Sequence, residues 1–328
     1  MAIQRYNPSH IQSTTFALVG LNVAIAIADI STGGLLERYG WARGIDVQYG
    51  EYWRIFTSGW VHASIMHIAF NAYGIYVLGT ITERLYGVKP LLVIYMAALL
   101  GGSGLSMVFY DPNIPTLGAS GAAYGLFGAV LGFFYVRTGS IKGIMQVPMG
   151  RQLLLWLGIG VFISLQPGIS FLGHLGGFVP GVFLGVFFEK LYMRHVDVWY
   201  WVGLGLVAAM IAGACVYGSF PYNRASWHAV QALRAYEQGD LARGDEYLAN
   251  ARRRSMRNDG TQKLMTHLNA WRAGHAEAPE RFNLSVLRLP LTHPRGVTFK
   301  GEHMPDLPFT FLKGPGSAEP LESSGDAP

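Results

Sequence analysis

Seven apolar segments, separated by short polar stretches, constrain this chain more than any other feature. We place them at about residues 14–31, 62–79, 90–110, 119–136, 152–166, 169–191 and 198–218. A helix needs about 20 apolar residues to cross a bilayer. Charged residues make up 14% of the chain, against about a quarter in a typical soluble domain. The pattern predicts an all-α membrane protein in which the second, fourth and fifth segments are short for a span or contain polar residues.

The charge distribution divides the chain near Pro221, because residues 220–328 hold 14 of the 25 Lys and Arg. The stretch "RASWHAVQALRAYEQGDLARGDEYLANARRR" resembles a tetratricopeptide helix pair, with one further helix at about 260–273. A plain helical hairpin explains the same stretch. We expect a short polar N-terminus (1–13), a six-helix core (14–191), a seventh helix (192–220), a helical soluble region (221–275) and an irregular or disordered tail (276–328).

Lys and Arg in the short loops predict the orientation. With the N-terminus inside, the outside loops carry Arg38, Arg43 and Arg54. The inside loops carry eight basic residues: Arg5, Arg84, Lys89, Arg137, Lys142, Arg151, Lys190 and Arg194. We therefore expect a cytoplasmic N-terminus and, after seven spans, a C-terminal tail outside. The loop at 32–61, rich in aromatic residues and Arg, is typical of structure lying in the headgroup region.

The remaining composition excludes several classes of protein. With one cysteine, Cys215, no intrachain disulfide framework can form. A net charge of +5 is ordinary for a membrane protein with basic inner loops and needs no nucleic-acid partner. The N-terminus has neither the cleavage site of a signal peptide nor a long arginine-rich leader, so we expect the first segment to stay as a helix. A bacterial inner membrane is the expected location.

Polar side chains at bilayer depth are costly and therefore mark candidate functional sites. His67 and Asn71 are four residues apart and share a helix face, as do Ser120 and Tyr124. His174 is the one histidine of its segment. We expect His62 to be an interfacial residue, and Glu83 with Arg84 to lie at the inner interface.

Small residues at every fourth position predict which helices pack closely. One ridge consists of Gly121, Gly125 and Ala129, and the other of Gly173, Gly177, Gly181 and Gly185. Such ridges allow two helix backbones to approach. If the two face each other, Ser120 and His174 flank one crossing within hydrogen-bond reach.

A serine beside a histidine is the minimum for nucleophilic catalysis. The backbone N–H of Ser120, with His67 and Asn71, would stabilise the oxyanion. Gly118 would let the chain turn before the serine, and Tyr124 would orient the imidazole. We see no acidic partner, so we expect a Ser–His dyad without metal or cofactor.

Less specific explanations apply to each residue alone. A serine in a membrane helix is usually a packing residue, and "GASGA" lacks the last glycine of the G-x-S-x-G elbow of soluble hydrolases. A transporter with proton-relaying histidines predicts paired acidic residues or inverted repeats; we see neither. A non-catalytic membrane chaperone or binding protein remains the main alternative.

Together these motifs resemble the rhomboid intramembrane serine proteases over roughly residues 14–191. "GASG" is similar to the family's nucleophile motif around Ser120, and "HLGGFVPG" to its sixth-helix motif around His174. "HASIMHIAFN" resembles the second-helix pattern with His67 and Asn71, and "EYWR" (residues 51–54) resembles the Glu-x-Trp-Arg of the first loop. Tyr124 stands where the family keeps a tyrosine against the catalytic histidine.

The resemblance implies a six-helix protease core with a water-filled cavity open to the outside. It implies cleavage of transmembrane protein substrates in the lipid bilayer, with no cofactor or metal. The fifth segment and the loop "LQPGIS" (165–170) would form the lateral gate and cap. The added helix and tail resemble a family subset that has C-terminal helical domains, and this region is expected to bind a protein partner.

Overall fold

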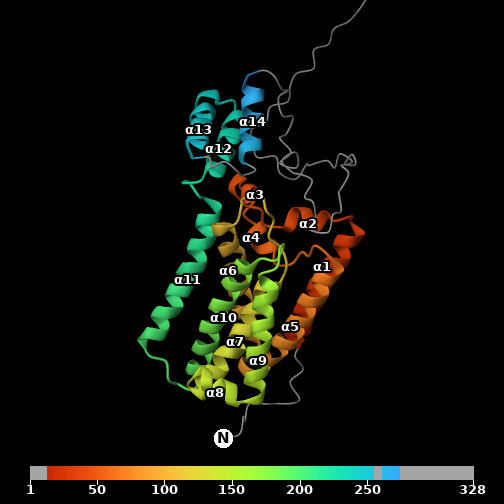
Figure 1. Cartoon of the computed structure of the whole chain (residues 1–328), viewed down its shortest axis with the longest axis vertical. Helices are drawn as coiled ribbons and strands as arrows, with labels where there is room; N and C mark the ends of the chain where they lie inside the picture. Colours follow the sequence, from red (N-terminus) through yellow and green to blue (C-terminus); the bar gives the residue numbers. More distant parts are fainter. Residues whose placement is uncertain (1–12, 255–260, 274–328) are drawn as a thin grey trace, which may run out of the picture. The chain divides into compact units, whose positions relative to one another are not determined.

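The computed structural model describes residues 13–254 and 261–273. The chain divides by its contacts into residues 1–287 and 288–328, and the second unit lies outside the described residues, as does the expected irregular tail. Within the described ranges the fold is all-α, and its β contact is an isolated bridge between Ala42 and Thr116. The helices (Figure 1) are α1 Ser13–Ser31, α2 Leu35–Gly40, α3 Gly44–Tyr49, α4 Arg54–Thr57, α5 Ile65–Tyr86, α6 Val88–Phe109, α7 Ser120–Thr138, α8 Ile141–Gln146, α9 Pro148–Ser164, α10 Phe171–Tyr192, α11 Val198–Ser219, α12 Ala225–Glu237, α13 Leu241–Arg254 and α14 Thr261–Arg272.

A helix stands at each of the seven apolar segments. Among the described residues, five helices are long and apolar enough to cross a membrane: α1, α5, α6, α10 and α11. The two others are α7, with 19 residues, and α9, with 17. The fifth segment is short as expected, whereas α7 is as long as α1. A total of seven crossings stays a prediction.

The helix at the second segment is longer than the segment predicted at 62–79. Ser64 accepts a hydrogen bond from the backbone N–H of His67 and so caps α5, which then runs for 22 residues. The polar residues that suggested an earlier end are accommodated, because the Glu83 carboxylate accepts hydrogen bonds from the backbone N–H groups of Thr14 and Thr15. Those groups begin α1 and have no partner within their own helix.

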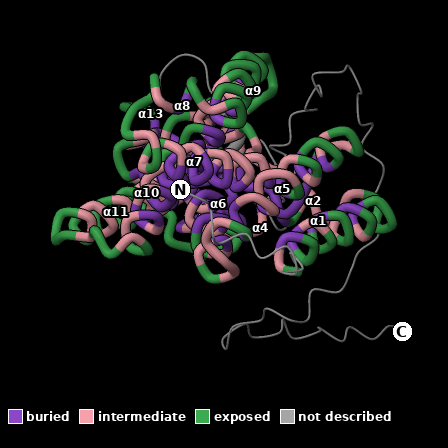
Figure 2. The backbone as a smooth tube through the Cα atoms, turned by 90° about the horizontal axis from the view of Figure 1, so that it is seen from below, coloured by how far each residue is buried: buried purple, intermediate pink, exposed green. Residues whose placement is uncertain are grey.

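The buried centre consists of α6, α7 and α10, which Figure 2 shows mostly in purple and pink. The expected facing of small residues is present there. A Cβ atom at Gly177 would overlap the carbonyl oxygen of Gly121, and one at Gly181 the carbonyl of Gly125. Gly185 repeats this relation with Ala129 one turn further on. We call this contact the α7–α10 crossing; only glycine allows the backbones to come so close.

Gly173 does not belong to that face. A Cβ atom there would meet the hydroxyls of Ser170 and Ser106 instead of α7. A second set of close approaches was not predicted from the sequence. In it, Gly101 and Gly102 of α6 face the carbonyls of Gly176 and Gly173. The spacing of four residues correctly identified α10 as a closely packed helix. Near its N-terminal end, however, α10 also packs against α6.

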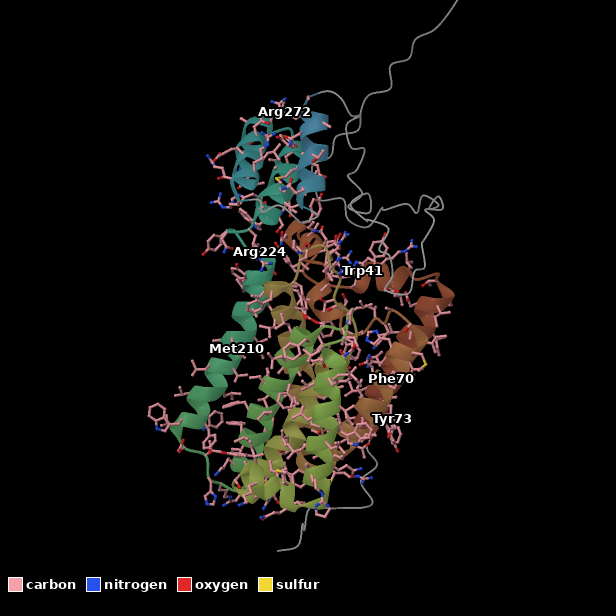
Figure 3. All side chains as sticks on the ribbon, in the orientation of Figure 1. Trp41, Phe70, Tyr73, Met210, Arg224 and Arg272 are labelled. Atoms are coloured by element: carbon pink, nitrogen blue, oxygen red, sulfur yellow. The ribbon has the colours of Figure 1, made fainter. Side chains whose placement is uncertain are left out.

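The outer helices expose apolar side chains, as expected where lipid surrounds a bundle. Phe70 and Tyr73 of α5 and Met210 of α11, labelled in Figure 3, are all exposed. Of the 17 residues of α9, only Gly150, Leu153 and Ser164 are buried. These helices therefore contact the centre along one narrow face.

The loop at 32–61 folds into α2, α3 and α4. Arg54, 4% exposed, donates to the carbonyl oxygens of Arg38 and Trp41 at 2.8 and 3.1 Å. Arg43 pairs with Asp46 through two hydrogen bonds. Buried guanidinium groups that bind several oxygens hold a loop of irregular backbone in one conformation.

The helices α12, α13 and α14 share an apolar cluster with α3 through Ile45. Tyr49 donates a hydrogen bond to Glu237 at 2.7 Å, and Arg224 (Figure 3) donates to the carbonyls of Met107 and Val108. The further helix expected at about 260–273 is α14. A tetratricopeptide relationship stays a prediction.

Candidate active site

The predicted site residues lie at helix ends on one side of the bundle. Ser120 is the first residue of α7, His174 the fourth of α10 and His67 the third of α5. The loop at 32–61 supports this end, because Gly118 donates to the carbonyl of Ser58 at 2.8 Å. All three residues thus lie within the first four residues of their helices.

Ser120 and His174 are in hydrogen-bond contact. Their Oγ and Nε2 atoms are 2.9 Å apart, although the residues are 54 positions apart in the sequence. The α7–α10 crossing directly below them sets the separation of the two helices. This distance is the one required between a serine nucleophile and its general base.

Tyr124, one turn below Ser120, stacks on the imidazole of His174. The ring centroids are 4.2 Å apart and the planes differ by 8°. Stacking on a half-buried ring restricts rotation of the histidine about its Cβ–Cγ bond. The structure therefore brings Ser120, His174 and Tyr124 together as the sequence predicted; their chemical roles stay predictions.

The segment before Ser120 requires a glycine. Gly118 has a φ of 109°, which L side chains rarely adopt, and a Cβ atom there would overlap the imidazole of His67. The ring of His67 thus lies directly against the turn that presents the serine. Because Ser120 begins α7, its backbone N–H has no partner within the helix.

Asn71 lies one turn after His67 and is buried. Its side-chain amide donates one hydrogen bond to the carbonyl of His67 at 2.9 Å. An amide nitrogen carries two N–H donors, so the second can serve a ligand. Together His67, Asn71 and the N–H of Ser120 offer donors near the serine.

His62 is buried in the wall of the site. Its place at the membrane interface stays a prediction. Its ring meets that of His67 edge to face at 5.0 Å, and its Nε2 accepts from the N–H of Ala119 at 3.3 Å. Burial, and then the neighbouring His67, lower the pKa of His62 to about 3. A neutral ring is the form that can accept this hydrogen bond.

Ser164 is the residue that the sequence analysis missed. Its Oγ lies 2.6 Å from the Nδ1 of His174. No spacing rule links it to His174, because it ends a different helix, α9. No group of three His, Cys, Asp or Glu side chains that could hold a metal ion occurs in the part of the chain that the structure describes.

Comparison with known proteins finds one family over the central part of this chain. A family model described as the rhomboid domain matches residues 49–191. The chain is 32% identical over 211 residues to "Rhomboid protease GluP" of Bacillus subtilis (strain 168), covering 62% of this chain and 39% of that protein. It is 33% identical over 139 residues to "RHOMBOID-like protein 6, mitochondrial" of Arabidopsis thaliana, covering 42% and 44%.

A third relative is "Rhomboid-like protease 1" of Toxoplasma gondii, with 26% identity over 168 residues, 51% of this chain and 57% of that protein. The chain thus spans less than two thirds of the length of these relatives. The apolar helices and these relatives identify a multi-pass integral membrane protein. Residues 49–191 match the rhomboid domain, and the chain is homologous to named rhomboid proteases.

Proposed function

We propose that this protein is an intramembrane serine endopeptidase that cleaves transmembrane protein substrates. The observation that carries the proposal is the 2.9 Å contact between Ser120 Oγ and His174 Nε2 at the end of a close helix crossing. Homology to named rhomboid proteases supports the same reaction class. No residue of the dyad departs from the motifs that the family resemblance rests on.

In the proposed reaction Ser120 Oγ attacks the peptide carbonyl while His174 Nε2 takes its proton. The tetrahedral intermediate collapses when His174 returns that proton to the leaving amine, which leaves an acyl group on Ser120. Water, deprotonated by His174, then attacks the ester; His174 returns the proton to Ser120 Oγ as the new carboxyl end leaves. The water would reach the site from the membrane boundary at which the dyad lies.

Negative charge on the carbonyl oxygen would be stabilised by three donors: the backbone N–H of Ser120 and the side chains of His67 and Asn71. Removing one such donor costs about 10²–10³ in turnover in other serine proteases. Gly118 supports this proposal because it lets the His67 ring approach the serine.

Transmembrane substrates would enter from the bilayer beside α9. Two observations support this. Few residues of α9 are buried, and its last residue, Ser164, contacts His174 of the dyad. A helix held by few buried residues can be displaced at a small cost in free energy. The loop at 165–170 would form the cap over the site.

The direct test is cleavage of a model membrane-spanning substrate by the full chain reconstituted in liposomes. Ser120→Ala and His174→Ala should each abolish cleavage, whereas Ser219→Ala, on α11, should leave it intact. A fluorophosphonate probe should label Ser120, with the modified residue identified by mass spectrometry. Cleavage that persists in Ser120→Ala would contradict the mechanism.

The alternative is a non-catalytic membrane protein that uses the same fold to hold helices. It predicts substrate binding without cleavage and no labelling of Ser120 by the probe. The dyad geometry favours the protease, since a holding function needs no hydroxyl directed at an imidazole nitrogen.

The proposed topology has the N-terminus in the cytoplasm of a bacterial cell and the C-terminal helices outside. It is supported by the basic inner loops and by the contact of α12 with α3, because both then lie on one side. Cysteine accessibility at Arg137→Cys and Arg243→Cys, each in a Cys215→Ala background, measures it. Labelling of the first from outside would contradict it.

The helices α12–α14 are proposed to bind a protein partner, and unchanged specificity after deletion of residues 222–328 would contradict that role.

A further inference from the structure

Ser164 makes a hydrogen bond that the proposed mechanism does not use. It is the last residue of α9 and is 2% exposed. Its Oγ contacts His174 Nδ1 at 2.6 Å, while Nε2 of the same ring contacts Ser120. The two hydroxyls therefore bind the two nitrogens of one imidazole.

The hydrogen-bond network assigns the protons at this serine. Its Oγ lies 2.6 Å from the carbonyl oxygen of Gly160 and 3.0 Å from the hydroxyl of Tyr124. A carbonyl oxygen only accepts, so the single proton of Ser164 is donated to Gly160. The two lone pairs of Oγ are then left to accept, one from Tyr124 O–H and one from His174 Nδ1–H.

This assignment determines the tautomer of His174. A neutral imidazole carries one N–H, and here it is at Nδ1. Nε2 consequently presents a lone pair to Ser120, as a general base must. If Ser164 donated to Nδ1 instead, the ring proton would lie on Nε2 and the serine could not transfer its own.

We infer that Ser164 is a positioning residue, which accepts the Nδ1–H hydrogen bond of His174 and so holds the imidazole in the tautomer that can deprotonate Ser120. The inference rests on the proposed function and adds a third group to the dyad. In serine proteases with an acidic third residue, that residue keeps the histidine in the same tautomer. A neutral hydroxyl does so here without a buried negative charge, which would be costly at this depth.

A serine that binds the carbonyl four residues earlier is common in membrane helices and has a purely local explanation. Ser219 provides the matched case. It is also the last residue of its helix, it is 4% exposed, and its Oγ donates to the carbonyl of Cys215 at 2.8 Å. Ser164 differs in that its oxygen also contacts Tyr124 and His174.

The first test measures the tautomer directly and does not need activity. In the full chain labelled with ¹⁵N-histidine in micelles, the ring nitrogens of His174 are assigned by their loss in His174→Asn. We expect Nδ1 to carry the proton in the native sequence and a mixture of tautomers in Ser164→Ala. A proton on Nε2 in the native sequence overturns the inference, whether or not the protein proves to be a protease.

The second test compares Ser164→Ala with Ser164→Thr and Ser219→Ala. In Ser164→Ala the rate of probe acylation at Ser120 and kcat should fall about 10-fold, the factor expected for loss of one neutral hydrogen bond, with KM unchanged. Ser164→Thr keeps the hydroxyl and should recover most of the rate, and Ser219→Ala should match the native chain. An unchanged rate and tautomer in Ser164→Ala overturn the inference, while absence of any activity in the native chain would contradict the proposed function alone.

Discussion

The helix that carries His174 and the helix that supplies Ser164 are packed very differently. In α10, which carries the histidine, ten of 22 residues are buried, and glycines bring its backbone against α7. In α9, which supplies Ser164, three of 17 are buried. Figure 2 shows the contrast in colour: α9 is largely green and α10 largely purple and pink.

The difference shows how rigidity is distributed around the site. The Ser120–His174 distance depends on the α7–α10 crossing, where each backbone fills the other's groove and little can shift. The hydrogen bond at Nδ1 depends on a helix with few buried contacts, whose displacement costs less free energy. Substitutions in the two helices should therefore have unequal effects.

The largest effect is expected for Gly177→Val at the α7–α10 crossing. Its side chain would overlap the backbone of Gly121, which cannot move aside, so stability should fall by about 3 kcal/mol, the upper end of overpacking costs. Cleavage should be lost with it. The control is Gly158→Val on α9, where a Cβ atom meets nothing within 4 Å. Equal melting temperatures for the two variants in detergent would contradict the comparison.

A smaller loss is expected for Gly121→Val on the opposite side of the crossing. A Cβ atom at Gly121 would lie 3.2 Å from the carbonyl oxygen of Gly173 and 3.5 Å from that of Ala98, so neighbours need to yield by only a few tenths of an ångström. We expect a cost of about 1–2 kcal/mol and reduced cleavage. Thermal unfolding and substrate cleavage measure both. A Gly121→Val variant that equals the native chain would show that the ridge does not set the dyad distance.

Gly160→Ala tests α9 where it meets the site. The added Cβ atom would lie 2.7 Å from the hydroxyl of Tyr124, the movable end of a side chain. Stability should change by less than about 1 kcal/mol, because the ring can shift. The turnover number should fall several-fold as the hydroxyl leaves Ser164. If Gly160→Ala lowers the melting temperature strongly but leaves the turnover number nearly unchanged, α9 is packed more firmly than its burial indicates.

Tyr124→Phe should have the smallest effect. It removes one donor from Ser164 but keeps the ring that stacks on His174 at 4.2 Å. We expect a reduction in turnover of about three-fold, within the range for one neutral hydrogen bond. Tyr124→Ala, which also loses the stack, is the comparison variant. A loss as large as that of Tyr124→Ala would mean that the hydroxyl, and not the ring, orients the histidine.

Much of this molecule could be predicted from its sequence because the relevant signals are local. Apolar segments of helical length set the class of fold. A spacing of four residues placed His67 with Asn71 and Ser120 with Tyr124 on common faces, and the two glycine ridges identified α7 and α10 as partners. The positive φ of Gly118 is also a local property of its turn.

Other features depended on contacts between distant segments, which carry no sequence period. Glu83, near the end of α5, accepts a hydrogen bond from Thr15 at the start of α1. His62 is buried and accepts a hydrogen bond from Ala119, 57 positions away. Ser164 reaches His174 only because the end of α9 lies beside α10. The sequence thus determined which residues could form a site, by periodicity along single helices. The tertiary structure alone decided which nitrogen of His174 each serine contacts, because that depends on how separate helices pack.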